Sequence, residues 1–176
     1  VVRDRSALSL AERDGAPMPR LLKMVESADR NARLGACQAM AALGKRAAPG
    51  VPALRKTLQT GDLWLRIKAA DALAAIGDDA MVALPELLTL LAAEDPKMDP
   101  RGMQQRYLSF ALFDRREGLL KRSLDGVDRD ALYQAILAGL HNEDGRARST
   151  LGNVYAKLST EEITPLLPAI HQAVVS

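Results

Sequence analysis

The stretch DLWLRIKAADALAAIG, residues 62–77, begins with an aspartate, ends with a glycine and is rich in alanine and leucine in between. A closely similar stretch, DRNARLGACQAMAALG, occupies residues 29–44. Six pairs of matching residues stand 33 positions apart in the two stretches: Asp29 and Asp62, Arg33 and Arg66, Ala36 and Ala69, Ala39 and Ala72, Leu43 and Ile76, Gly44 and Gly77. The same interval continues beyond them: Pro19, Pro52 and Pro85; Leu21, Leu54 and Leu87; Val25, Leu58 and Leu91. A period of this length predicts a stacked array of repeats.

Each repeat reads as two helices. In the first helix, apolar residues recur every three or four positions and form one stripe. The stripe residues in the two copies are Leu65, Ala69, Ala72, Leu73 and Ile76, and Ala32, Ala36, Ala39, Met40 and Leu43. Gly44 and Gly77 are predicted to end these helices as left-handed residues. The second helix is expected to start at Pro52 or Pro85 and to run to about residue 59 or 92.

The later part of the chain repeats less regularly. DGRARSTLGNVYAKLS, residues 144–159, is a looser copy with Ala147, Leu151, Val154, Tyr155 and Leu158 on its stripe. Ser159 and Glu162 predict a capping box that opens a last helix, ITPLLPAIHQAV. Helices are also expected over residues 100–113, with Asp99 as N-cap and Pro100 at the first helical position, and over residues 128–141. Residues 114–127 fit no repeat and are interpreted as an insertion.

The predicted fold is therefore an all-α solenoid of antiparallel helix pairs, with about 8–10 helices. We expect one domain over residues 1–176, with regular repeats at 19–93, an irregular insert at 94–127 and a further repeat at 128–176. Because the N-terminus reads as the middle of a repeat and both ends carry apolar residues, Val1, Val2, Val174 and Val175, we expect a fragment of a longer protein.

Composition agrees with packed helices. The chain has 176 residues, of which 48% are hydrophobic but only 3% aromatic, so the core must be built from aliphatic side chains. The net charge of +2 is too small to indicate a polyanion partner by itself. Neither a signal peptide nor an apolar run long enough for a membrane span is present in the sequence, and the compartment is not predicted.

The repeated pattern resembles the HEAT repeat in its short phycobilisome-lyase-like form. It consists of an aspartate, an arginine four residues later, two alanines at intervals of three, and a terminal glycine that is followed by a proline and a leucine-rich helix. The later stretches GVDRDALY, NEDGRARSTLGNVYAKLS and PLLPAIHQAV are similar to the HEAT segment of large, uncharacterised bacterial multidomain proteins. The resemblance implies a superhelix whose second helices line a concave, protein-binding face. The word lyase labels the repeat type, and fold alone does not carry activity.

Residues that could support catalysis have simpler structural interpretations. The resemblance implies that the pairs Asp29/Arg33, Asp62/Arg66 and Asp144/Arg148 form a ladder between repeats, and an aspartate at a helix start also caps the helix. Cys37, the only cysteine, aligns with Ala70 and is expected to be buried and inert. His141 and His171 lack metal-ligand spacing. We therefore expect no enzyme activity, cofactor or metal.

One region departs from this pattern. Between residues 97 and 122 the sequence carries seven cationic residues against three acidic ones, together with Tyr107, Phe110 and Phe113. These residues form either a binding loop or an ordinary core with a solvated surface, and the second interpretation is favoured. Lys23 and Lys56 occupy equivalent positions on successive second helices, and Thr89 ends the series. Trp64 is expected either to cover the joint between two repeats or to act as an interface anchor for a partner. The candidate partner-binding residues are Lys23, Lys56, Arg115, Arg116, Lys121 and Arg122.

The expected function is a non-catalytic scaffold that binds a protein, a peptide or other domains of the same chain on its concave face. A nucleic-acid-binding or DNA-glycosylase-like protein is an alternative that the mild net charge disfavours. Chromophore-lyase-like activity is a second alternative, implied by the repeat label alone. The oligomeric state is not predicted.

Overall fold

The computed structural model describes residues 18–143 and 145–175, and over these residues it contains helices and no strand, which confirms the all-α prediction. The elements are α2 (Met18–Val25), α3 (Arg30–Leu43), η1 (Gly44–Gly50), α4 (Val51–Thr60), α5 (Leu63–Ile76), η2 (Gly77–Ala83), α6 (Leu84–Ala92), α7 (Met103–Phe113), α8 (Arg129–His141), α9 (Gly145–Tyr155), α10 (Thr160–Ile163), η3 (Thr164–Leu166) and α11 (Leu167–Val175). The chain divides into two compact units, with the boundary between Glu86 and Leu87. A single domain over residues 1–176 stays a prediction.

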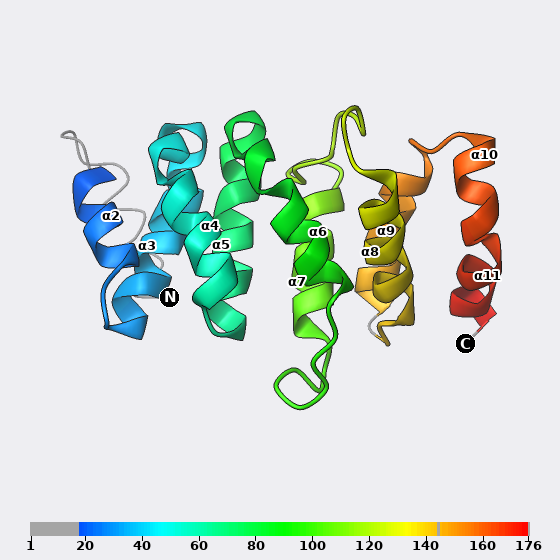
Figure 1. The fold of residues 1–176 in the computed structure, drawn as a ribbon, viewed down its shortest axis with the longest axis horizontal. Helices are drawn as coiled ribbons and strands as arrows, with labels where there is room; N and C mark the ends of the chain where they lie inside the picture. Colours follow the sequence, from blue (N-terminus) through cyan, green and yellow to red (C-terminus); the bar gives the residue numbers. More distant parts are fainter. Residues whose placement is uncertain (1–17, 144, 176) are drawn as a thin grey trace. The chain divides into compact units, whose positions relative to one another are not determined.

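In unit 1, residues 1–86, the described first helices pack on each other and the described second helices pack on each other. The first helices α3 and α5 pack side by side, and the second helices α2 and α4 contact each other (Figure 1). All five predicted stripe residues of α5 are buried, and so are four of the five in α3, with Ala32 partly exposed. Because alanine places only a methyl group between the backbones, this stripe allows α3 and α5 to approach closely.

The ends of the first helices are set by an aspartate and a glycine. The Asp62 carboxylate accepts hydrogen bonds from the backbone N–H groups of Trp64 and Leu65, at 3.0 and 3.1 Å, as an N-cap does. Gly44 and Gly77 have φ angles of 56° and 81°, so the predicted positive φ is confirmed. Their ψ angles, −133° and −134°, are not those of a left-handed helical residue. The chain instead turns directly into the 3-10 segments η1 and η2, which lead to α4 and α6.

Unit 2, residues 87–176, packs α7 and α8 against α9, and α11 against α8. The predicted helix over residues 128–141 is confirmed as α8. Asp128 is its N-cap, since its carboxylate accepts from the backbone N–H of Ala131 at 3.1 Å. The predicted capping box of Ser159 and Glu162 is also present. Phe113 is buried, whereas Tyr107 and Phe110 are partly exposed, so the expectation that Tyr107 and Phe110 are core residues is not met.

Two predicted helices of unit 2 were placed wrongly. The helix expected from Pro100 begins three residues later, at Met103, after Gly102 with φ 58°. Asp99 still caps it, because its carboxylate accepts from the backbone N–H groups of Met103 and Gln104, at 2.9 and 2.7 Å. The last helix is not continuous but is divided into α10, η3 and α11. Pro165 and Pro168 lack an N–H group and so cannot extend a regular helix through this segment.

Candidate functional site

The first two candidate residues lie where the repeat pattern placed them. Lys23 on α2 and Lys56 on α4 are exposed, and neither forms an ion pair with another described residue. The neighbouring Arg55 is different, because both its Nε and Nη2 donate to Glu86 Oε1. Lys23 and Lys56 are therefore exposed cations on the second helices of unit 1.

The other four candidates lie on the insert after α7, residues 114–127. The Asp114 carboxylate accepts hydrogen bonds from the backbone N–H groups of Arg116 and Glu117, at 2.8 and 2.9 Å. These bonds, from Glu117 first and Arg116 second, hold the pKa of Asp114 below its ordinary value. The turn leaves Arg115 and Arg116 exposed at its surface. Lys121 is partly exposed and Arg122 is exposed.

Backbone bonds to α7 fix the middle of the insert. The N–H groups of Leu119 and Leu120 donate to the carbonyls of Ala111 and Leu112, at 2.8 and 2.9 Å, and both leucines are buried. Gly118 passes so close to α7 that a Cβ there would come within 2.7 Å of the Leu112 carbonyl. The insert thus has a defined path.

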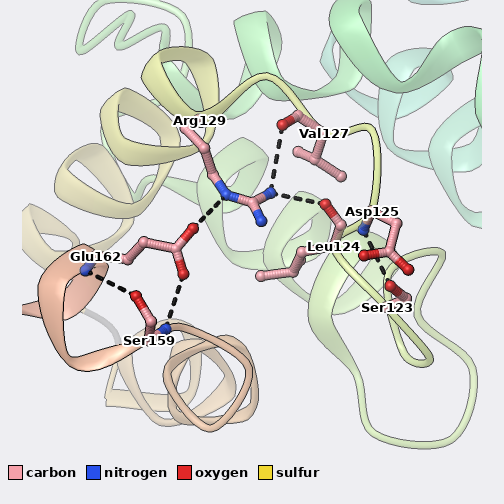
Figure 2. Close-up of polar contacts among 7 residues, drawn as sticks. All are labelled: Ser123, Leu124, Asp125, Val127, Arg129, Ser159 and Glu162. Atoms are coloured by element: carbon pink, nitrogen blue, oxygen red, sulfur yellow. Dashed lines mark hydrogen bonds and ion pairs between the residues drawn. The ribbon is translucent and has the colours of Figure 1, made fainter.

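Side chains from α8 and from just after α9 bind three carbonyls of the insert, and a side chain of α9 binds the last carbonyl of α7. Arg129 Nη1 donates to the Leu124 carbonyl at 2.7 Å and to the Val127 carbonyl at 3.3 Å (Figure 2). Asn153 Nδ2 donates to the carbonyl of Phe113 at 3.1 Å, and Lys157 Nζ donates to the carbonyl of Leu120. Burial lowers the pKa of Lys157. The insert therefore presents its cations from a backbone that the surrounding helices hold.

The ladder between repeats exists, but its basic residue was assigned wrongly. Arg30, not Arg33, reaches the next repeat, and its Nε donates to Asp62 Oδ2 at 2.6 Å. The same arrangement recurs in unit 2, where Arg129 Nε donates to Glu162 Oε1 at 2.7 Å (Figure 2). In both cases the arginine directly follows the N-cap aspartate, so the dipeptide Asp-Arg at 29–30 and 128–129 was the available signal. The predicted pair of Asp144 and Arg148 lies partly outside the described residues, since Asp144 is not among them.

The reactive residue types are held in unreactive settings. Cys37 is fully buried, as predicted, and burial raises the pKa of its thiol to about 12. Burial likewise raises the pKa of Tyr155 to about 12, and its hydroxyl has no hydrogen-bond partner among the described residues. His141 and His171 are both exposed. In the part of the chain that the structure describes, no three His, Cys, Asp or Glu side chains gather as a metal site would require. None of the helices described there is long and apolar enough to cross a bilayer.

The six candidates are divided between the two units. Lys23 and Lys56 belong to unit 1, and the four residues of the insert belong to unit 2. Sequence reasoning also missed a cavity of about 300 Å³ in unit 2, next to the start of α7. Its walls come from residues 94–105 and 138–143, about forty positions apart, so no local pattern could indicate it.

The comparisons with known proteins agree with the helix pairs. A search of curated proteins and a search of solved structures each found no match. The family model described as HEAT repeats matches residues 1–99, which is more than half of the chain and includes the two regular copies of the pattern. With its helix pairs, its buried alanine stripe and this match, the chain belongs to the HEAT-repeat family.

Proposed function

We propose that this protein is a non-catalytic interaction module that binds a protein or peptide on the face formed by its second helices. HEAT repeats commonly mediate protein–protein interaction, and stacked repeats offer an extended surface instead of a deep substrate pocket. The observation that carries the proposal is the pair Lys23 and Lys56 on the neighbouring helices α2 and α4, which are exposed and form no ion pair with another described residue. An acidic segment lying across these helices would pair with both lysines.

The insert supports a second contact in the same proposal. Its path is fixed by backbone hydrogen bonds to α7 and by the side chains of Arg129 and Lys157, so its cationic side chains are presented without a large further loss of backbone entropy on binding. Arg115 and Arg116 stand next to each other on an exposed turn. Paired arginines suit carboxylate groups, because each guanidinium can donate two parallel hydrogen bonds.

Site-specific crosslinking tests the proposal. A photoreactive amino acid replaces Lys23, Lys56 or Arg116 in the full chain, and the matched control carries it at Ala75, which is exposed on the first helix α5. We expect the same partner protein to be crosslinked from Lys23 and Lys56 but not from Ala75, and the crosslink at Lys23 to weaken when Lys56 is changed to Glu. Equal crosslinking from Ala75, or none from any position, refutes the proposal.

Nucleic-acid binding remains a second candidate because four cations, Arg115, Arg116, Lys121 and Arg122, fall within eight residues of one another. Binding through phosphates releases counterions and therefore weakens steeply as salt rises. Fluorescence anisotropy with a labelled DNA duplex distinguishes the two functions. Tight binding at low salt that disappears at higher salt, and that requires Arg115 and Arg116, favours this candidate. Absence of binding at low salt removes it.

A further inference from the structure

The cavity in unit 2 opens between the loop that leads into α7 and the end of α8. In Figure 1 this loop projects at the N-terminal end of α7, which is also where α8 finishes. The volume of about 300 Å³ is at the lower end of the range for ligand pockets. It is large enough for the end of one long side chain, but small for an extended cofactor.

The lining of this cavity is acidic although the whole chain carries a net charge of +2. Four carboxylates line it, Glu94, Asp95, Asp99 and Glu143, against one arginine, Arg101. The C-terminal turn of α8 adds partial negative charge from carbonyls that have no partner within the helix. The cavity is therefore a favourable environment for a cation.

Two of the four carboxylates already have partners. Both oxygens of Asp99 accept from the first N–H groups of α7, and Asp95 Oδ1 accepts from the backbone N–H of Met98 at 3.1 Å. The carboxylates of Glu94 and Glu143 form no ion pair or hydrogen bond with another described residue, and both side chains are at the exposed rim. These two carboxylates are available to a ligand.

The floor of the cavity gives a second, independent indication that a ligand binds there. Gln105 lines the cavity and is only 5% exposed, and its Nε2 donates to the carbonyl of Ala93. Because a carbonyl can only accept, the amide nitrogen must face Ala93, which leaves Oε1 on the other side. Oε1 has no hydrogen-bond partner among the described residues, yet it is not sealed in the core, so it opens onto the cavity.

The neighbouring amide keeps this acceptor in place. Asn142, 8% exposed, donates from Nδ2 to the carbonyl of Gly102 at 2.8 Å and so ties the end of α8 to the residue before α7. A Cβ on Gly102 would lie only 2.2 Å from that nitrogen and 3.5 Å from Gln105 Oε1. The floor is therefore a preformed arrangement in which the largely buried Gln105 side chain presents to the cavity one acceptor oxygen that has no donor among the described residues.

We propose that this cavity binds the positively charged end of an arginine or lysine side chain presented by a protein partner. The cationic N–H groups donate to Gln105 Oε1, and the positive charge lies between the carboxylates of Glu94 and Glu143. An anion is repelled by the same lining, and a neutral donor gains only the single bond to Oε1. The inference rests on the proposed interaction function and specifies one chemical group of the partner.

The test uses the full chain labelled with ¹⁵N and no protein partner. The probe is the peptide acetyl-Gly-Arg-Gly-amide, and its control replaces arginine with citrulline, which has nearly the same shape and no charge. We expect the arginine peptide, with a dissociation constant in the millimolar range, to shift the side-chain amide signals of Gln105 and Asn142. The citrulline peptide should leave them unchanged. Absence of a shift with arginine, or equal shifts with citrulline, overturns the inference.

Variants separate the cavity from general electrostatics. The double substitution Glu94→Gln and Glu143→Gln should weaken the arginine peptide by about tenfold, whereas Glu117→Gln, which removes an exposed charge on the insert, should leave its affinity unchanged. Equal weakening by Glu117→Gln contradicts the site. A chain that crosslinks a partner from Lys56 but ignores the arginine peptide refutes the cavity alone, while a chain that binds the peptide but crosslinks nothing refutes the proposed function alone.

Discussion

Replacing Ala69 with glutamate should destabilise unit 1 severely. Ala69 has no exposed surface, and it lies on the stripe of α5 that packs against α3. The larger side chain alone costs about 1–3 kcal/mol by overpacking. A buried carboxylate without a partner costs several kcal/mol more, or takes up a proton instead. We therefore expect a loss of about 3–5 kcal/mol in the free energy of unfolding, a large part of the ~5–15 kcal/mol typical of a domain.

Urea unfolding followed by circular dichroism measures this loss. Ala75→Glu is the matched control, since it places the same residue at an exposed position of the same helix and should change the free energy of unfolding by less than about 0.5 kcal/mol. Ala69→Leu isolates the volume effect. Because burial raises the pKa of the new carboxyl in the folded state, the folded state binds more protons, and the penalty should shrink as the pH falls. If Ala69→Glu and Ala75→Glu unfold at the same urea concentration, the buried stripe is assigned to the wrong side of α5.

Three further predictions concern the caps, the acids and the thiol. Asp62→Ala should lower the free energy of unfolding, measured with urea, by about 1 kcal/mol because it removes the N-cap of α5. Asp62→Asn keeps a capping oxygen and should lower this free energy by less. The reverse order would exclude the capping role. The folded-state pKa values of Asp62, Asp114 and Glu162 are lowered, chiefly by the Arg30 side chain for Asp62 and by backbone N–H groups for the other two. In this pH range the unfolded chain therefore binds more protons than the folded chain. The stability that these three carboxylates contribute should be fully present above their ordinary pKa values, 3.8 for Asp and 4.5 for Glu, and should be lost as the pH falls below those values. A free energy of unfolding that stays constant through this range contradicts the prediction. Cys37, with its pKa raised to about 12, should resist iodoacetamide in the native protein and react once urea unfolds it; alkylation at the rate of a free thiol without urea would show that the site opens.

The sequence predicted the regular repeats well because their signals are local. Apolar spacing, an N-cap aspartate and a terminal glycine each act within one or two helical turns, and α5 begins and ends within one residue of its expected limits. The start of α7 was wrong for a related reason. Pro100 suits the first position of a helix, but Asp99 reaches over it to cap Met103, and Gly102 turns the chain between them.

The features that sequence reasoning missed depend on distance in space. Which arginine bridges two repeats is decided by how far one helix start lies from the next, so Arg30 and Arg33 could not be told apart from their spacing alone. The acidic cavity joins Gly102 to Asn142, forty residues later, and its significance depends on the orientation of the Gln105 amide. Neither property appears in hydrophobic periodicity or composition.

Arg129 links two segments of unit 2 that lie far apart in the sequence. One guanidinium bonds both to the insert, through the carbonyls of Leu124 and Val127, and to Glu162, which in turn holds the first turn of α10. Melting of α10 would release Glu162 and leave the arginine free to turn away from the insert. If a partner binds the insert as proposed, the same side chain would carry part of the resulting stabilisation to α10.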